Sequence, residues 1–175
     1  MKLSKTLARC LVAGGALLTG TTVLAATGLQ KQAAIDGGLN WLATQQAPNG
    51  SWCQTGYCDA DTASALLAFI EQHTKAAGWN GHDYSATVSN GLTYLMGSAT
   101  TIGVGNRSDG QFADLMPDGL GFIWGGNEST YVTGLVLPTL SRAITAGFVG
   151  ANDMASNTGY TWRQVVQNTV DTFLQ

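Results

Sequence analysis

"NWLATQQAPNGSW", residues 40–52, is the stretch that decides the predicted fold. An apolar helical pattern ends at the glutamines, and Pro48 with Gly50 predicts a break and a turn. Gln46 lies at the helix end, where backbone groups lack helical partners and a side-chain amide can cap them. We expect Trp52 to fold back over the Gln46 amide, with Gly50 allowing the tight turn. Gln46, Gly50 and Trp52 are together called the clasp.

Apolar spacing along the rest of the chain is helical, and no segment shows convincing strand alternation. A helix that is apolar nearly all round, at 61–74, should be buried, whereas the one-sided first helix should lie outside. Pro138 predicts a kink, or a division into two short helices, within the fourth. Thr161 and Gln164 form the capping-box pattern that starts the fifth. The predicted helices are residues 30–46, 61–74, 85–96, 129–147 and 161 onward.

An aromatic residue followed by leucine recurs in three of these helices. The pairs begin at Trp41, Tyr94 and Phe173, at spacings of 53 and 79 residues. "NGSW" at 49–52 is echoed by "DGQF" at 109–112. Repeats of helical pairs at this length indicate arrays of helical hairpins.

The first copy resembles the repeat of squalene-type cyclases and protein prenyltransferase β-subunits. That pattern is a small residue, an aromatic, an aliphatic, a glutamine, a glycine and a tryptophan at fixed spacing. Gly37 stands where those families usually have a basic residue. The motif covers about 20 residues, and the helix rhythm covers most of 30–175. The matching positions are Gly38, Trp41, Leu42, Gln46, Gly50 and Trp52.

This resemblance implies an all-α fold of helical-hairpin repeats that forms part of an α/α toroid. It assigns the motif a structural role rather than a catalytic one. We expect residues 26–175 to be the repeat domain, and we expect that domain to be incomplete.

Residues 1–25 have the order of a secretory signal peptide. Lys2, Lys5 and Arg9 precede an apolar run rich in small residues, and cleavage is expected after Ala25 or Ala26. The run is shorter than the roughly 20 residues of a spanning helix, so no transmembrane anchor is expected after cleavage. We therefore expect export by a Sec-type signal to the periplasm or the exterior.

The charge balance excludes one class of partner. The chain has 8 Lys and Arg and 11 Asp and Glu, so removal of the three leader cations leaves 5 − 11 = −6. Nucleic-acid binding needs clustered cations, which the mature chain lacks. The expected partner is a small molecule or a protein, and homo-oligomers are expected if the chain is complete.

Cys53 and Cys58 suggest a local disulfide in an oxidising compartment. Zinc is the alternative, and only His73, His82 and loop carboxylates could complete its ligand set. Free thiols are the third possibility. We predict no metal and no cofactor.

Asp59 and Asp61, in "DADTA", are the candidate catalytic residues. Class II terpenoid cyclases carry an Asp-x-Asp-Asp-Thr-Ala run whose central acid protonates an alkene. Aligning the Asp-Thr-Ala end places Ala60 on that acid, so the acid set is incomplete. The alternative is that Asp59 or Asp61 caps the second helix. Cys58-Asp59 also lacks the Asp-x-Cys order of the prenyltransferase zinc site.

Carboxylates in the later Gly-rich stretch do not follow a calcium-loop pattern. Asp109, Asp114 and Asp118 are interpreted as solvated loop residues.

The sequence thus predicts an exported repeat protein that acts as a binding or interaction module with an unknown ligand. Its candidate contact aromatics are Tyr84, Phe122, Trp124 and Tyr131, for which core positions are the alternative. The competing hypothesis is the N-terminal part of a prenyltransferase-like or terpenoid-cyclase-like enzyme with catalytic residues beyond Gln175.

Overall fold

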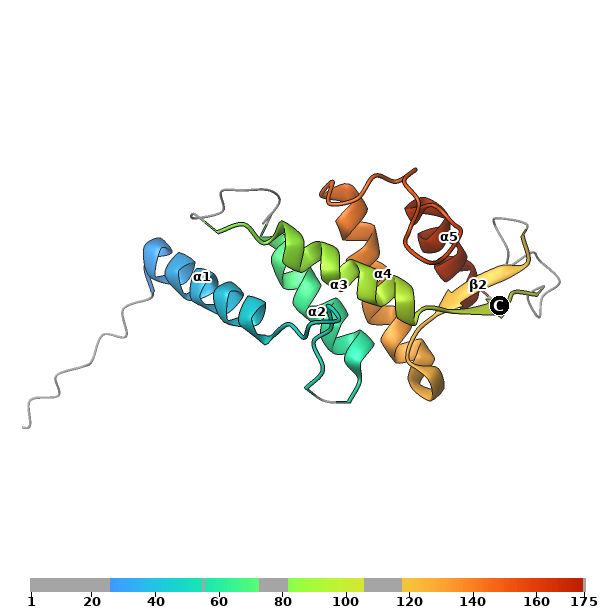
Figure 1. Cartoon of the computed structure of the whole chain (residues 1–175), viewed down its shortest axis with the longest axis horizontal. Coiled ribbons are helices and arrows are strands. Elements are labelled where there is room, and N and C mark those ends of the chain that lie inside the picture. Colours follow the sequence, from blue (N-terminus) through green and yellow to red (C-terminus); the bar gives the residue numbers. More distant parts are fainter. Residues whose placement is uncertain (1–25, 55, 73–81, 106–117, 175) are drawn as a thin grey trace, which may run out of the picture.

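Five α-helices make up most of the computed structural model, which describes residues 26–54, 56–72, 82–105 and 118–174. This confirms a largely all-α class. α1 lies at one end of the molecule and a small sheet at the other, with α2, α3 and α4 between them (Figure 1). The helices are α1 (Gly28–Gln45), α2 (Cys58–Glu71), α3 (Ser85–Ser98), α4 (Ser129–Thr145) and α5 (Trp162–Phe173), and a 3-10 turn, η1 (Gly126–Glu128), precedes α4.

Capping boxes start α1 and α5. The Thr161 side chain accepts from the Gln164 backbone, and the Gln164 side chain accepts in return from the Thr161 backbone, which confirms the predicted helix start. Thr27 and Gln30 make the same exchange at α1. These bonds satisfy backbone donors that have no partner within the helix.

The core is built around α2, which packs against both α3 and α4. Leu66, Phe69 and Ile70 of α2 are fully buried, as the sequence predicts for a helix that is apolar nearly all round. Each such side chain contributes about 1.5–3 kcal/mol by leaving water. α5 packs against α4 on the other side of the core.

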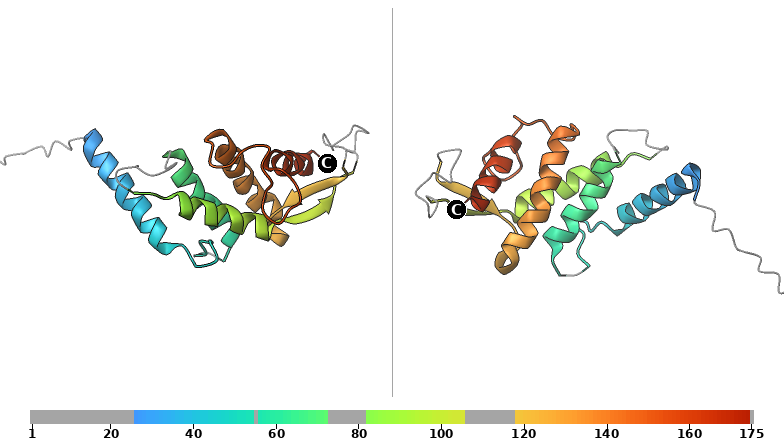
Figure 2. Two further views of the ribbon diagram at one scale, coloured as in Figure 1. Left: turned by 45° about the horizontal axis from the view of Figure 1, so that its top comes forward. Right: turned by 180° about the vertical axis from the view of Figure 1, so that it is seen from behind.

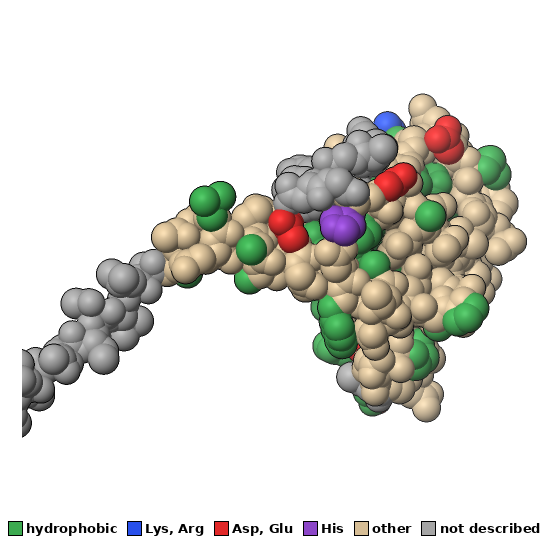
Figure 3. Space-filling model, turned by 60° about the vertical axis from the view of Figure 1, so that its left-hand side comes forward, with side chains coloured by type: hydrophobic (Ala, Val, Ile, Leu, Met, Phe, Trp, Pro, Cys, Tyr) green, Lys and Arg blue, Asp and Glu red, His purple; other side chains and the backbone are tan. Residues whose placement is uncertain are grey.

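α1 lies outside this core, as its one-sided pattern predicts. Leu39 is its only buried side chain, whereas Trp41 is 59% exposed. Figure 3 shows α1 projecting from the body of the molecule with hydrophobic side chains at its surface.

A two-stranded antiparallel sheet corrects the expectation that no strands form. β1 (Thr100–Gly103) pairs with β2 (Leu120–Ile123), with Thr100 opposite Ile123. β2 packs against α5 at the end of the molecule remote from α1 (Figure 2). A Cβ at Gly121 would lie 2.3 Å from the Thr172 hydroxyl, so the strand approaches α5 too closely for a side chain there.

Pro138 does not divide α4 into two helices, so the predicted division at this residue is wrong. The helix continues through it from Ser129 to Thr145. Pro138 itself is exposed, while Val136 and Leu140 on either side are fully buried. Burial of these neighbours offsets the hydrogen bond that a proline removes.

Candidate functional site

The clasp joins the end of α1 to α3. Gln46 Nε2 donates to the Gly50 carbonyl at 3.0 Å and to the Thr87 carbonyl at 2.9 Å. Gln46 therefore holds its own loop closed and ties that loop to the next helix. These contacts give the amide the capping role expected from its position.

Trp52 folds back toward α1 and is 3% exposed. Its indole nitrogen donates to the Leu42 carbonyl at 2.8 Å. Its ring lies beside Phe69, with ring centroids 6.0 Å apart, and its Cζ3 lies 3.0 Å from where a Gly91 Cβ would be. The indole thus packs in the core between α2 and α3.

Gly50 is required for two reasons. Its φ is +90°, which side-chain-bearing residues rarely adopt, and a Cβ there would lie 2.3 Å from the Asn90 carbonyl oxygen. The loop after α1 therefore lies directly against the backbone of α3.

Trp124 makes three hydrogen bonds equivalent to those of Trp52, each with a partner of the same type at a different position. The Trp52 backbone donates to the Thr62 hydroxyl at 3.0 Å, and that hydroxyl donates back to Trp52 at 3.2 Å. Trp124 exchanges equivalent bonds with Thr133, at 3.0 and 3.4 Å. Its indole donates to a leucine carbonyl at 2.6 Å, that of Leu95.

These bonds relate the two aromatic-leucine helices to each other. Leu42 and Leu95, the indole acceptors, are the leucines of the first two recurring pairs. The proposed echo at 109–112 lies outside the described residues. The tryptophan that matches Trp52 in bonding is instead Trp124, which lies beyond β2.

An apolar groove runs between α1 and α2 and has a volume of about 670 Å³. We call it the α1/α2 groove. The aromatic residue of its lining is Trp41, which is 59% exposed, and the charged residue is Glu71, the last residue of α2. The lining residues are Ile35, Gly38, Leu39, Trp41, Leu42, Ser64, Leu67, Ala68, Glu71 and Gln72.

The α1 side of this groove corresponds to the side of α3 that α2 covers. Aligning Leu42 with Leu95 places Gly38 on Gly91. At Gly91 a Cβ would lie 2.8 Å from Leu66 of α2, whereas at Gly38 nothing lies within 4 Å. The close contact that α3 makes with α2 at Gly91 therefore has no counterpart at Gly38 of α1 among the described residues.

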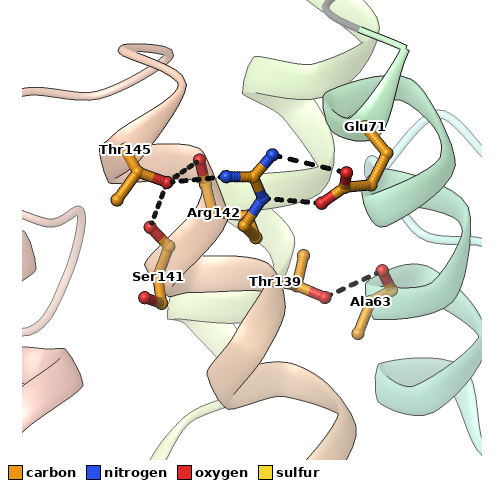
Figure 4. Close-up of polar contacts among 6 residues, drawn as sticks. All are labelled: Ala63, Glu71, Thr139, Ser141, Arg142 and Thr145. Carbon is orange, nitrogen blue, oxygen red and sulfur yellow. Dashed lines mark hydrogen bonds and ion pairs between the residues drawn. The ribbon is translucent and has the colours of Figure 1, made fainter.

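The α2 side of the groove corresponds to the side of α4 that faces α2. Aligning Thr62 with Thr133 places Ala68 on Thr139 and Glu71 on Arg142. Figure 4 shows what those two α4 residues do: Thr139 donates to the Ala63 carbonyl at 3.1 Å, and Arg142 pairs with Glu71 at 2.6 Å. The α1/α2 groove thus corresponds to the space between α3 and α4 that α2 fills.

Asp59 lies in a separate, polar pocket of about 580 Å³ at the start of α2 and α4. Its Oδ1 atom is buried and accepts no hydrogen bond from the residues that the structure describes. Burial raises the pKa of Tyr94, and the Asp59 carboxylate, which is hydrogen-bonded to Tyr94, raises it further. Glu128 lines the same pocket.

Neither candidate aspartate caps α2, which corrects the capping interpretation. The helix begins at Cys58 and its N-cap residue, Tyr57, makes no side-chain capping bond. Asp61 instead accepts from the Gln54 backbone at 2.8 Å. Both aspartates lie in the first turn, where negative charge is favourable.

Three of the four candidate contact aromatics are core residues, so the core alternative holds for them. Tyr84, Phe122 and Trp124 are 4%, 2% and 1% exposed. Tyr84 donates to Asn40, and burial, with a further contribution from Asp36, raises its pKa. Only Tyr131, at 61% exposure, remains available to a partner.

The sulfur atoms of Cys53 and Cys58 lie at disulfide-bonding distance. Within the described ranges, no group of three or more His, Cys, Asp or Glu could hold a metal ion. His82 is exposed, 3.2 Å from Asn40 and stacked on Tyr84. Asp118 accepts from Asn168. His73, Asp109 and Asp114 lie outside the described residues.

Among the described residues, no helix combines the length and the apolar character that crossing a membrane requires. Comparison with protein-family models, curated proteins and solved structures finds no match to the chain.

Proposed function

We propose that the protein is an exported repeat module of the α/α-toroid kind that binds an apolar α-helix of a partner polypeptide in the α1/α2 groove. The observation that carries the proposal is the correspondence of this groove with the space that α2 fills between α3 and α4. Because α2 fills the matching space between α3 and α4, a helix that resembles α2 should fit the α1/α2 groove.

The two matching tryptophan sites support the assignment of repeat units. α1 and α2 are joined through Trp52, and α3 and α4 through Trp124, by the same donor and acceptor types. Each unit is one helical hairpin, and stacked hairpins bury an inner face against their neighbours. In this arrangement α1 and α2 form a unit whose outward side is covered by no other helix that the structure describes.

Small residues in the groove favour a helix over a bulky ligand. Gly38 permits close approach of a backbone, as Gly91 permits the approach of Leu66. Trp41, Leu42 and Leu67, which are exposed or partly buried, supply apolar surface for the partner. Burying leucine-sized side chains on both partners is the main favourable term for such binding.

Export is supported by the signal-like residues 1–25 and by the cysteine pair. Disulfides persist mainly in oxidising compartments, which fits a periplasmic or extracellular location. The mass of the secreted chain tests this: a start at residue 26 or 27 and a loss of two hydrogens are expected.

Binding is tested with a labelled peptide of residues 58–72, carrying Cys58→Ser, added to chain 26–175. Every buried side chain that the structure describes lies between Leu39 and Asp171, so this portion retains the described core. We expect saturable binding in fluorescence anisotropy. Gly38→Leu fills the groove and should weaken binding at least about tenfold, or about 1.4 kcal/mol.

Gly37→Leu is the matched control. Neither glycine has an atom within 4 Å of an added Cβ, but only Gly38 lines the groove. Both variants should fold at least as well as the parent, because leucine has a higher helix propensity than glycine. Equal binding by both variants would refute the proposed site.

A second candidate function, part of a cyclase-like or prenyltransferase-like enzyme, is favoured by one observation. Asp59 places a buried, unpartnered carboxylate oxygen in the polar pocket beside Tyr94. Continuation of the coding frame beyond Gln175 with an Asp-x-Asp-Asp run, or with Asp-x-Cys and a distant His, would favour this alternative. Repeats without these residues favour the binding module.

A further inference from the structure

The surface of α1 that lines the α1/α2 groove is apolar, and part of it is exposed. Trp41 is 59% exposed, and Ile35 and Leu42 beside it are partly buried. Figure 3 shows α1 projecting from the body of the molecule, where a second molecule can reach it. We propose that a second copy of the chain is the partner, and that α1 of each copy lies in the α1/α2 groove of the other. This proposal rests on the proposed function, because it names the polypeptide that supplies the helix.

Gly38 determines where the two α1 helices cross. It lies midway along the part of α1 that lines the groove, and nothing lies within 4 Å of a Cβ added there. A C2 interface brings the same surface of both copies together. A twofold axis at Gly38 therefore makes the two helices antiparallel and places each residue i opposite residue 76 − i. The two glycines face each other, Trp41 lies opposite Ile35 of the partner copy, and Leu42 lies opposite Ala34.

Each α1 also contacts α2 of the partner copy, which forms the other side of the groove. Leu67 and Ala68 of α2 line this side and are partly buried. Removing Trp41 and these α2 side chains from water on both copies is the main favourable term for association. An interface made by one helix pair and its flanking residues is small, so we expect dimerisation in the micromolar range.

Charge complementarity favours this arrangement. Lys31 is exposed on α1 and lies opposite Gln45 of the partner copy. Gln45 shares a pocket with Asp61, which lies in the first turn of α2. Within one copy, Lys31 and Gln45 are 14 residues apart, or about 21 Å along the helix. The Lys31 ammonium group therefore approaches an Asp61 carboxylate only between copies, and the twofold axis gives each dimer two such pairs.

Sedimentation equilibrium of chain 26–175 at low ionic strength tests the assembly. We expect a reversible monomer–dimer equilibrium without larger species, because a C2 interface closes on itself. Lys31→Glu and Asp61→Lys should each weaken dimerisation at least about fivefold, since each dimer then contains two pairs of like charge. An equimolar mixture of the two variants should dimerise about as strongly as the parent, because the mixed dimer contains only pairs of opposite charge. A chain that stays monomeric at every concentration, or a mixture no stronger than either variant alone, would overturn the proposal.

A second test leaves the charged residues unchanged. A disulfide needs its two Cα atoms within about 7 Å, so Gly38→Cys should link two copies at least about tenfold faster than Gly37→Cys. Gly37 is the matched control, because an added Cβ there is also free of contacts but points about 100° away around the helix. Equal rates of linkage at the two positions would overturn the twofold axis at Gly38.

The peptide of residues 58–72 separates this proposal from the proposed function. It should convert dimers to monomers, because the peptide and the second copy require the same groove. A monomeric chain that still binds the peptide through Gly38 would overturn the dimer and leave the proposed function standing. A dimer that shows the expected charge and linkage behaviour but does not bind the peptide would support the dimer and refute an α2-like partner.

Discussion

Replacing Gly50 by alanine should loosen the clasp, because the added methyl group meets two separate obstacles. The first is the backbone, since a φ of +90° strains any residue with a side chain. Such strain costs about 1–3 kcal/mol. The second is steric: the new Cβ would lie 2.3 Å from the Asn90 carbonyl oxygen and 2.7 Å from its carbon. Overpacking of this kind costs a further 1–3 kcal/mol or so.

Gly56→Ala separates these two costs. Gly56 has nearly the same φ, +89°, but nothing lies within 4 Å of its added Cβ. The difference in free energy of unfolding between Gly50→Ala and Gly56→Ala therefore measures the contact between the loop and α3. We expect Gly50→Ala to be less stable by about 1–3 kcal/mol, at roughly 2–4 °C in Tm per kcal/mol.

Urea unfolding, followed both by far-ultraviolet circular dichroism and by tryptophan fluorescence, is the suitable assay. Coincident transitions would justify a two-state analysis. Equal destabilisation by the two substitutions would mean that the loop does not lie against Asn90, and the reasoning about the clasp would be wrong.

Three further outcomes are expected. Replacing both Cys53 and Cys58 by serine should cost about 2 kcal/mol in urea unfolding, since the disulfide closes a short loop; no change would mean that the thiols are free. Arg142→Met should lower the free energy of unfolding only slightly, and high salt should abolish the difference, because Arg142 and Glu71 are 40% and 46% exposed. The raised pKa of Tyr94 favours the neutral phenol in the folded state. The phenol's contribution to stability is therefore present below pH 10 or so and is lost as pH rises through the pKa of the folded state. Tyr94→Phe should reduce this loss of stability at alkaline pH.

Periodicity and local side-chain chemistry made most of the helices predictable. The capping box at Thr161 depends only on neighbouring residues, and so does the turn at Gly50. The buried central helix, α2, was predictable because its own residues are apolar nearly all round. The start of α2 was placed three residues late, because Cys58 and Asp59 have no apolar pattern and no side-chain cap marks the N-terminus of the helix.

Features that depend on contacts between distant segments were not predictable in this way. β1 and β2 are four residues each and contain glycines, so neither shows measurable alternation, and pairing stabilises them only with α5 behind. Trp124 lies 29 residues from its acceptor, Leu95, whereas Trp52 lies 10 from Leu42. The sheet occupies the extra length and hides the second tryptophan site from a search at fixed spacing.

The candidate site also depends on contacts between distant segments, so the sequence predicted it only in part. Aromatic residues in Gly-rich sequence resemble contact residues, yet Phe122 and Trp124 are buried. Phe122 lies on β2, which packs against α5, and the Trp124 indole donates to Leu95 of α3, so both depend on segments distant in the chain. The α1/α2 groove was not predicted at all, because it is defined by what α1 lacks in comparison with α3. The signal was present in the pairing of Gly38 with Gly91, but its meaning depends on knowing that Leu66 lies against the second glycine.

The most direct test of the central claim is the amide resonance of Gly38 in ¹⁵N-labelled chain 26–175 as peptide 58–72 is added. We predict a saturable shift at Gly38 and at Ala68 across the groove, with little change at Gly97, which lies on α3 and has open space around it. Shifts confined to the polar pocket around Asp59, or no shift at Gly38 at saturation, would contradict the claim that α1 and α2 accept a helix as α3 and α4 do.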